Sequence, residues 1–231
     1  MPDIDDATQL VAEVRRRLPD EGYVHIARVL PEEVFNAAAQ QLGTIMLRTD
    51  IRVDSEADDA LRRARNPLYA DRPSVYRAEG LSYHTDSPLI DVLAWYCVAQ
   101  DAVDGTSALV DAGDLTEHFS DEEQVALARV RVRSMVRGAD GHEVVREFPL
   151  FAAGKVYYAS WLLAEDLRDD ERVLAARFAE YIAYKDATAP IRIRLKPGET
   201  LFIDNHRVLH GRSKIPPDSK RHLVRFYIKT A

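Results

Sequence analysis

The chain has 231 residues, with 31 Lys and Arg against 38 Asp and Glu, which gives a formal charge of −7 and a pI near 5.5. This excess of acid excludes a basic protein that binds nucleic acid through its bulk charge. The hydrophobic (46%) and charged (30%) fractions are typical of a globular chain and exclude disordered and collagen-like classes. At this length we expect one domain over residues 1–231, with one sizeable core.

The single cysteine, Cys97, lies in the apolar run 93–98. It cannot form an internal disulfide, and the run predicts a buried thiol. No stretch of 18 apolar residues is present, and the chain begins with acidic residues where a signal peptide would be basic. We therefore expect a cytoplasmic protein that binds neither nucleic acid nor membrane, and the oligomeric state stays open.

The first 80 residues predict helices that cover a core. Apolar residues at helical spacing predict a helix over 6–17, and 23–27 has the pattern of a short strand. A proline followed by two glutamates at 31–33 begins a second helix. Residues 50–71 are polar and arginine-rich without a clear period, which predicts a loop with a partial helix.

Strand patterns dominate from residue 74 onward. The predicted strands cover 75–76, 91–98, 107–110, 191–195, 200–203 and 222–229. Acidic clusters at 121–123 and 169–171 each begin a predicted helix, the first over Val125, Leu127 and Val130. The pattern predicts a mainly β fold with α elements: an antiparallel barrel or sandwich with helical cover and a helical insertion at about 112–186.

The first candidate for chemistry is the pair His84 and Asp86. Residues two apart in an extended strand point to the same face, so an imidazole nitrogen and a carboxylate oxygen are offered to one metal ion. A His-x-acid pair is expected about once by chance in a chain with seven histidines. Taken alone, the pair therefore favours two side chains that flank a turn.

A second segment supplies a third ligand. An apolar strand ends at the turn pair Asp204 and Asn205, and His210 follows beside Gly211, which has no side chain to crowd a ligand. Two histidines and one carboxylate leave the opposite face of a metal ion open, which suits non-haem iron(II) that binds an organic oxo-acid and dioxygen. The same ligand set serves zinc hydrolases, and the ligands alone leave both metals open.

The C-terminal strand carries two arginines. Alternation places Arg221, Leu223, Arg225 and Tyr227 on one face. Two arginines on a largely apolar strand are costly to bury unless each meets an anion, and a guanidinium pairs bidentately with a carboxylate. The alternative is an edge strand with solvated arginines.

These residues together resemble a known family. The set His84-x-Asp86, Asn205-x-Arg207-x-x-His210-Gly211-Arg212, Arg221 and Arg225 looks like the iron(II)- and 2-oxoglutarate-dependent oxygenases of the taurine dioxygenase and clavaminate synthase type. The resemblance runs from about residue 83 to the C-terminus and is looser over the first 70 residues. It implies a double-stranded β-helix, or jelly roll.

The resemblance also implies residue roles. His84, Asp86 and His210 would be the iron ligands, and Arg221 would pair with the far carboxylate of 2-oxoglutarate. Residues 104–111 are similar to the family stretch whose hydroxyl touches that carboxylate, which implies Ser107, with Thr106 as the alternative. Arg225 would then face the substrate or support that pair. Tyr83 and Ser82 precede the first ligand and are expected, from that position, to line the substrate pocket.

The reaction expected from the resemblance is hydroxylation of an unactivated C–H bond, with release of succinate and carbon dioxide. Halogenation is disfavoured because related halogenases lack the carboxylate ligand, and Asp86 is present. Desaturation or ring closure stays open, as does a zinc hydrolase or a cupin-like binding protein. The substrate is expected to be small, polar and amino-acid-like, with its contacts in 50–80 and 148–186. His206, four residues before His210, is expected to lie beside the site or on the surface.

Overall fold

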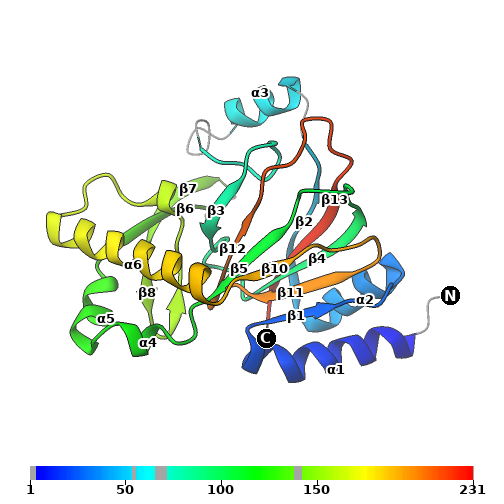
Figure 1. Cartoon of the computed structure of the whole chain (residues 1–231), viewed down its shortest axis with the longest axis horizontal. Helices are drawn as coiled ribbons and strands as arrows, with labels where there is room; N and C mark the ends of the chain where they lie inside the picture. Colours follow the sequence, from blue (N-terminus) through cyan, green and yellow to red (C-terminus); the bar gives the residue numbers. More distant parts are fainter. Residues whose placement is uncertain (1–3, 54–55, 66–71, 138–141, 231) are drawn as a thin grey trace.

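Two facing antiparallel sheets form the centre of the protein, and helices lie outside them (Figure 1). The computed structural model describes residues 4–53, 56–65, 72–137 and 142–230. One sheet has five strands in the order β1-β11-β4-β13-β2, and the other has four in the order β10-β5-β12-β3. These strands are β1 (Tyr23–Ile26), β2 (Thr44–Ile51), β3 (Leu81–His84), β4 (Val92–Ala99), β5 (Ser107–Asp111), β10 (Ile191–Ile193), β11 (Thr200–Asp204), β12 (Val208–Arg212) and β13 (His222–Lys229).

Strand β4 shows why the sheets pack as they do. Its odd-numbered residues, such as Leu93, Trp95 and Cys97, pack in the apolar layer between the two sheets. Its even-numbered residues, such as Ala94 and Tyr96, pack against the N-terminal helices. A strand buried on both faces has no polar alternation, which explains its continuous apolar sequence. The predicted burial of the Cys97 thiol is confirmed.

Helices α1 (Ile4–Glu21) and α2 (Glu32–Leu42) cover the outer face of the five-stranded sheet (Figure 1). Phe35 of α2 is fully buried at the centre of this contact. Its ring lies 5.5 Å from that of Tyr96, 6.0 Å from that of Phe202 and 5.4 Å from that of Phe226, centroid to centroid. One aromatic side chain therefore joins α2 to three strands.

We expect Phe35→Ala to lower the free energy of unfolding by about 3–5 kcal/mol, because it deletes a fully buried ring and leaves a cavity. Urea unfolding monitored by circular dichroism measures this change. Val125→Ala is the control, since Val125 is 66% exposed and surface substitutions usually change stability by less than about 0.5 kcal/mol. Equal stabilities of the two variants would contradict the packing described.

The segment between β5 and β10 is more varied than predicted. Its elements are α4 (Leu115–His118), α5 (Asp121–Leu127), β6 (Arg131–Arg137), β7 (Glu143–Pro149), β8 (Phe151–Ala152), β9 (Lys155–Val156), a 3-10 turn (Ser160–Leu162) and α6 (Asp169–Thr188). Helices α5 and α6 begin at the predicted acidic clusters. Helix α5 ends at Leu127, so Val130 lies beyond it. The insertion also contains the β6–β7 and β8–β9 hairpins, which were not predicted.

Two further expectations are corrected in the N-terminal part. The predicted strand at Val75 and Tyr76 is a turn, because only two apolar residues stand between polar neighbours. Strand β2 was not predicted: it lies at the edge of its sheet and most of its side chains are exposed, so it lacks an apolar stripe. The predicted partial helix corresponds to α3 (Glu56–Arg65); residues 54–55 and 66–71 of that segment lie outside the described residues.

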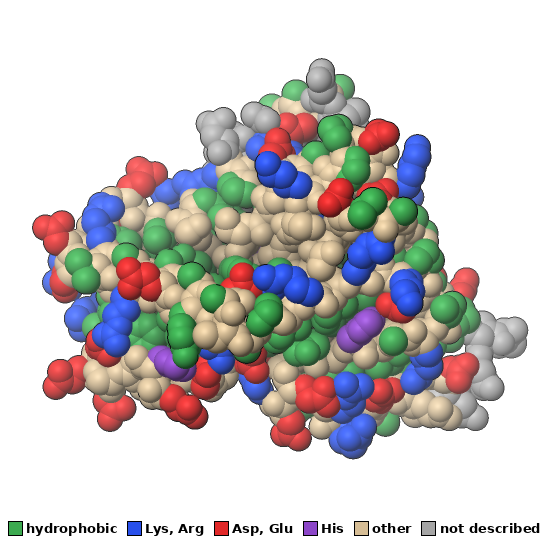
Figure 2. All heavy atoms as spheres, in the orientation of Figure 1, with side chains coloured by type: hydrophobic (Ala, Val, Ile, Leu, Met, Phe, Trp, Pro, Cys, Tyr) green, Lys and Arg blue, Asp and Glu red, His purple; other side chains and the backbone are tan. Residues whose placement is uncertain are grey.

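Charge is spread over the surface. Figure 2 shows acidic and basic side chains interspersed on the face that it presents. Over the residues described, no helix has the length and apolar character needed to cross a bilayer.

Candidate active site

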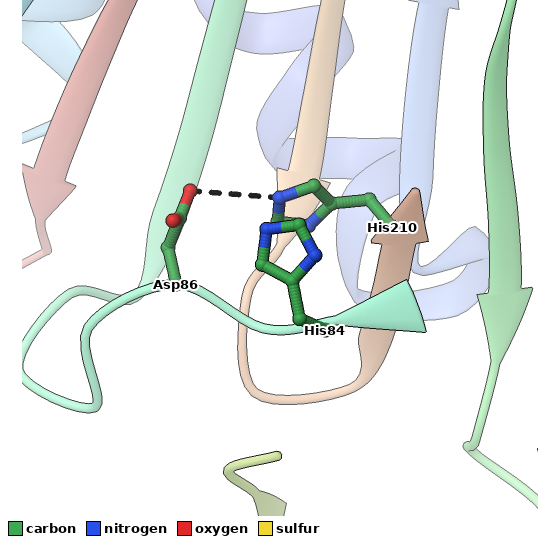
Figure 3. A group of neighbouring side chains, drawn as sticks. All are labelled: His84, Asp86 and His210. Atoms are coloured by element: carbon green, nitrogen blue, oxygen red, sulfur yellow. Dashed lines mark ion pairs between the residues drawn. The ribbon is translucent and has the colours of Figure 1, made fainter. Parts of the chain in front are cut away.

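Three potential metal ligands converge at one end of the four-stranded sheet (Figure 3). His84 is the last residue of β3 and lies opposite His210 of the neighbouring strand β12. Asp86 follows two residues later, where the chain has left the strand. One ligand atom from each residue lies within 4.8 Å of the others, and His210 Nε2 is 3.5 Å from Asp86 Oδ2. The structure therefore brings together the two sequence segments that were expected to supply ligands to one metal ion.

Backbone and amide groups fix the orientation of two of these ligands. His84 Nδ1 lies 2.8 Å from the carbonyl oxygen of Ser82. Because a carbonyl only accepts, Nδ1 carries the proton and Nε2 keeps the lone pair that a metal needs. The buried Asn205 side chain accepts a hydrogen bond from the Asp86 amide at 2.8 Å and donates to the carbonyls of Ser87 (3.0 Å) and Ile90 (3.3 Å). The asparagine of the sequence motif thus holds the loop that carries Asp86.

Burial gives these side chains the protonation that metal binding requires. It lowers the pKa of His84, and burial together with the nearby His84 lowers the pKa of His210 to about 3. Burial acts in the opposite direction on Asp86, but the charge of Arg225 and a hydrogen bond from Tyr227 outweigh it, so the pKa of that carboxyl is lowered. At neutral pH the site offers two neutral imidazoles and one carboxylate, which is a complete ligand set before any metal arrives.

The close approach of two strands requires a glycine at position 211, which the sequence did not show. A Cβ atom at this position would lie 2.7 Å from the carbonyl oxygen of Leu81 on β3. The glycine therefore allows β3 to approach β12 where the pairing register shifts, between His210 and Arg212. It also lines the cavity beside the metal ligands, as the absence of a side chain led us to expect.

Unpaired buried nitrogen atoms are concentrated on residues that line a small cavity next to the histidines. Among the described residues, eight buried side-chain nitrogen or oxygen atoms have no hydrogen-bond partner, and five of them belong to residues that line this cavity. The five atoms are Trp95 Nε1, His210 Nδ1, Arg212 Nε, Arg221 Nε and Arg225 Nε. A buried unpaired donor costs about 1–3 kcal/mol, so the cavity is suited to an occupant rich in acceptor oxygens.

The two arginines of the C-terminal strand segment are buried. Arg221 and Arg225 are each 6% exposed, and β13 lies between β4 and β2, so the alternative of an edge strand with solvated arginines is wrong. Arg225 lies 3.4 Å from Asp86 and its guanidinium stacks over the ring of Tyr227 at 4.5 Å.

Arg221 has no salt bridge to any residue that the structure describes. Burial, and then the like charge of Arg212, lowers its pKa to about 10. The guanidinium is therefore still charged at neutral pH, and it is the group in the cavity that most needs an anion.

The hydroxyl candidates differ in position. Ser107 begins β5, is 3% exposed and lines the cavity together with Arg221. Thr106 is not among the lining residues, and its amide donates to the Ser213 hydroxyl at 3.1 Å. The geometry therefore favours the serine as the hydroxyl that faces a cavity occupant.

A larger cavity of about 370 Å³ opens on the other side of the metal ligands. The two segments in which we expected substrate contacts both line it, through residues such as Tyr76, Arg77 and Trp161. Three further contributions were not predicted from the sequence: Leu47 of β2, Tyr227 of β13 and the β6–β7 hairpin. The hairpin supplies Ser134, Met135 and Glu143.

Ser82 and Tyr83 lie outside both cavities, which corrects the expectation that they line the pocket. The Ser82 side chain is exposed, and only its carbonyl takes part in the site. The Tyr83 hydroxyl donates to Asp186 of α6 at 2.5 Å and accepts from Arg192 at 3.2 Å. Strand β3 turns this side chain toward the helical insertion, so Tyr83 joins the sheet to α6.

The remaining motif residues bond to other parts of the chain. Arg207 donates to both carboxylate oxygens of Asp111, at 2.7 and 2.6 Å. His206 lies 3.0 Å from Asp91 and belongs to neither the ligand group nor the cavities described above. Arg212 is bonded to backbone carbonyls of the segment that precedes β3.

Comparisons with known proteins agree with this geometry. Residues 2–227 match the taurine catabolism dioxygenase TauD, TfdA family. An asparagine oxygenase solved with Fe(II), 3-hydroxyasparagine and succinate is 17% identical, with a TM-score of 0.68 over 96% of this chain and 78% of that one.

Two other solved structures have the same fold. The non-heme iron oxygenase OrfP with Fe and alpha-ketoglutaric acid is 16% identical, with a TM-score of 0.65 over 99% of this chain and 84% of that one. A taurine dioxygenase from Burkholderia xenovorans is 17% identical, with a TM-score of 0.65 over 96% and 82% of the two chains. The facing sheets are thus the jelly roll that the resemblance implied, and the chain belongs to the taurine catabolism dioxygenase TauD, TfdA family of iron(II)- and 2-oxoglutarate-dependent dioxygenases.

Proposed function

We propose that this dioxygenase hydroxylates an unactivated C–H bond of a small, polar, amino-acid-like molecule. The observation that carries the proposal is the small cavity with five unpaired donors directly beside two histidines and a carboxylate. A dicarboxylate such as 2-oxoglutarate supplies the acceptor oxygens that these donors lack. When bound, iron(II) with 2-oxoglutarate and dioxygen supplies the oxidising chemistry, which releases succinate and carbon dioxide.

The residues of the chain have separate tasks in this proposal. His84, Asp86 and His210 hold the iron from one side and leave the opposite side open to the cosubstrate and dioxygen. Arg221 pairs with the far carboxylate of 2-oxoglutarate, and Ser107 donates its hydroxyl to the same group. A zinc hydrolase needs no such anion clamp, so the buried charge of Arg221 favours the oxygenase.

Arg225 connects the two cavities, because it lines both of them. Its contact with Asp86 orients that ligand, and its position in the lining of the larger cavity lets its charge attract an anionic group of the substrate. Hydroxylation is proposed over halogenation because the carboxylate of Asp86 occupies the ligand position that a halide would need. Desaturation or ring closure is the alternative outcome within the same family.

Two observations support an amino-acid-like substrate. The larger cavity is lined by both signs of charge, with Arg225 and Glu143 in addition to the ion pair of Arg77 and Asp59, which suits a zwitterion. Similar solved structures hold hydroxylated amino acids, namely 3-hydroxyasparagine in the asparagine oxygenase and (3S)-hydroxy-L-Arg in OrfP. A cytoplasmic setting is part of the proposal and is supported by the single, buried cysteine.

A panel of the free amino acids tests the substrate class. We expect at least one amino acid to raise succinate formation above the uncoupled background and to gain the mass of one oxygen atom, as measured by mass spectrometry. A product that loses two hydrogens instead would favour desaturation or ring closure. Background succinate with every amino acid, together with turnover of a different substrate class, would contradict the amino-acid assignment.

A further inference from the structure

Arg212 of β12 lies between the two cavities. Its side chain lines the small cavity together with Arg221, and the residue is only 7% exposed. The guanidinium donates to three carbonyl oxygens of one segment: Val75 at 3.3 Å, Arg77 at 2.6 Å and Glu79 at 2.5 Å. The buried Arg212 side chain therefore contacts both the small cavity, which we call the cosubstrate cavity, and the backbone of residues 75–79. The larger cavity is called the substrate cavity.

The segment held in this way, residues 72–80, has no helix or strand. One more bond to this segment comes from the Ile215 amide, in the loop after β12, which donates to the Ala78 carbonyl at 3.0 Å. A segment without regular hydrogen bonding opens at low free-energy cost unless other groups satisfy its backbone. Its position thus depends on the Arg212 contacts.

The same segment forms a wall of the substrate cavity through Val75, Tyr76 and Arg77. Arg77 Nε also donates to Asp59 of α3 at 2.9 Å, which connects the wall to that helix. Contacts therefore run without a gap from the cosubstrate cavity, through Arg212, to the substrate cavity and α3.

The positive charge around the small cavity makes the position of Arg212 depend on whether an anion is bound there. Arg212 and Arg221 are buried cations that line the same cavity, and neither forms a salt bridge to a carboxylate in the part of the chain that the structure describes. Buried like charges repel each other, and an anion between them removes the repulsion. A bound dicarboxylate would hold the Arg212 guanidinium where it meets the three carbonyls.

We propose that Arg212 is a positioning residue that couples binding of 2-oxoglutarate to ordering of residues 72–80, and so to formation of the substrate cavity. The proposal rests on the proposed function of the small cavity. It assigns to Arg212 no contact with the reacting atoms; the residue acts through the backbone of the wall that it holds.

Hydrogen–deuterium exchange of the anaerobic iron(II) protein, with and without 2-oxoglutarate, tests this coupling. In the wild type we expect 2-oxoglutarate to slow exchange in residues 72–80 by about fivefold or more, the lower end of typical couplings between sites. Arg212→Lys keeps the positive charge but cannot hold three carbonyls. It should still show ligand protection in β5 and β12, with no protection in 72–80.

Arg194→Lys is the matched control. Arg194 is exposed and also donates to a backbone carbonyl, that of Asp104 at 3.3 Å, so its substitution should leave the wild-type response unchanged. Protection of β5 and β12 without protection of 72–80 in the wild type, or an unchanged response in Arg212→Lys, would overturn the coupling. Absence of protection everywhere in the wild type would overturn the cosubstrate site as well. If Arg212→Lys does not fold, the wild-type comparison still overturns the coupling when residues 72–80 are not protected.

Discussion

Arg221→Met is expected to weaken 2-oxoglutarate binding about 30-fold or more, because losing one partner of a buried charge pair costs about 2–5 kcal/mol and every 1.4 kcal/mol is tenfold in affinity. The free protein should fold at least as stably as the wild type. Its Arg221 is 6% exposed and has no carboxylate partner among the described residues, so methionine replaces an uncompensated buried charge with an apolar chain of similar length.

Titration calorimetry of 2-oxoglutarate into the anaerobic iron(II) protein measures the affinity, and urea unfolding of the metal-free protein measures the stability. Arg194→Met is the control, since Arg194 is exposed and lies outside the lining of the cavity. An affinity within threefold of the wild type for Arg221→Met would show that this guanidinium does not hold the cosubstrate.

His210→Ala is expected to lose metal affinity by more than about 100-fold, because loss of a group that merely supports a ligand already costs 10–100-fold. His206→Ala is a closely matched control: the two histidines are four residues apart, but His206 bonds to Asp91 at 3.0 Å and lies outside the ligand group. Calorimetric titration with Co(II) compares the variants. Equal affinities, or equal losses, in both variants would contradict the assignment of the ligands.

The ligand set and the C-terminal strand were predictable because their signals are local. His84 and Asp86 are two residues apart, and the spacing from Asn205 to Arg212 is a short motif. Strand β13 has the predicted bounds, since every apolar residue in it packs on one sheet face or the other. The close pairing of His84 with His210 was only implied, since it depends on the register between β3 and β12.

The residues that line the two cavities were less predictable than the metal ligands, because their positions depend on packing between segments far apart in the sequence. Ser82 lies two residues before His84 and would share its strand face. It is nevertheless exposed, because β3 is an edge strand with a register shift. The β6–β7 hairpin that lines the larger cavity was not predicted from an insertion with strong helix signals. Trp95 lies in an apolar run, and nothing in such a run shows that an indole will line the small cavity beside the metal ligands.

The most direct test of the central claim is the optical spectrum of the protein under anaerobic conditions with iron(II) and 2-oxoglutarate. Chelation of the metal by the keto-acid end of the cosubstrate produces a weak visible charge-transfer band. We predict this band for the wild type and for His206→Ala, and its absence for His210→Ala. No band in the wild type, or an unchanged band in His210→Ala, would contradict the account of this site.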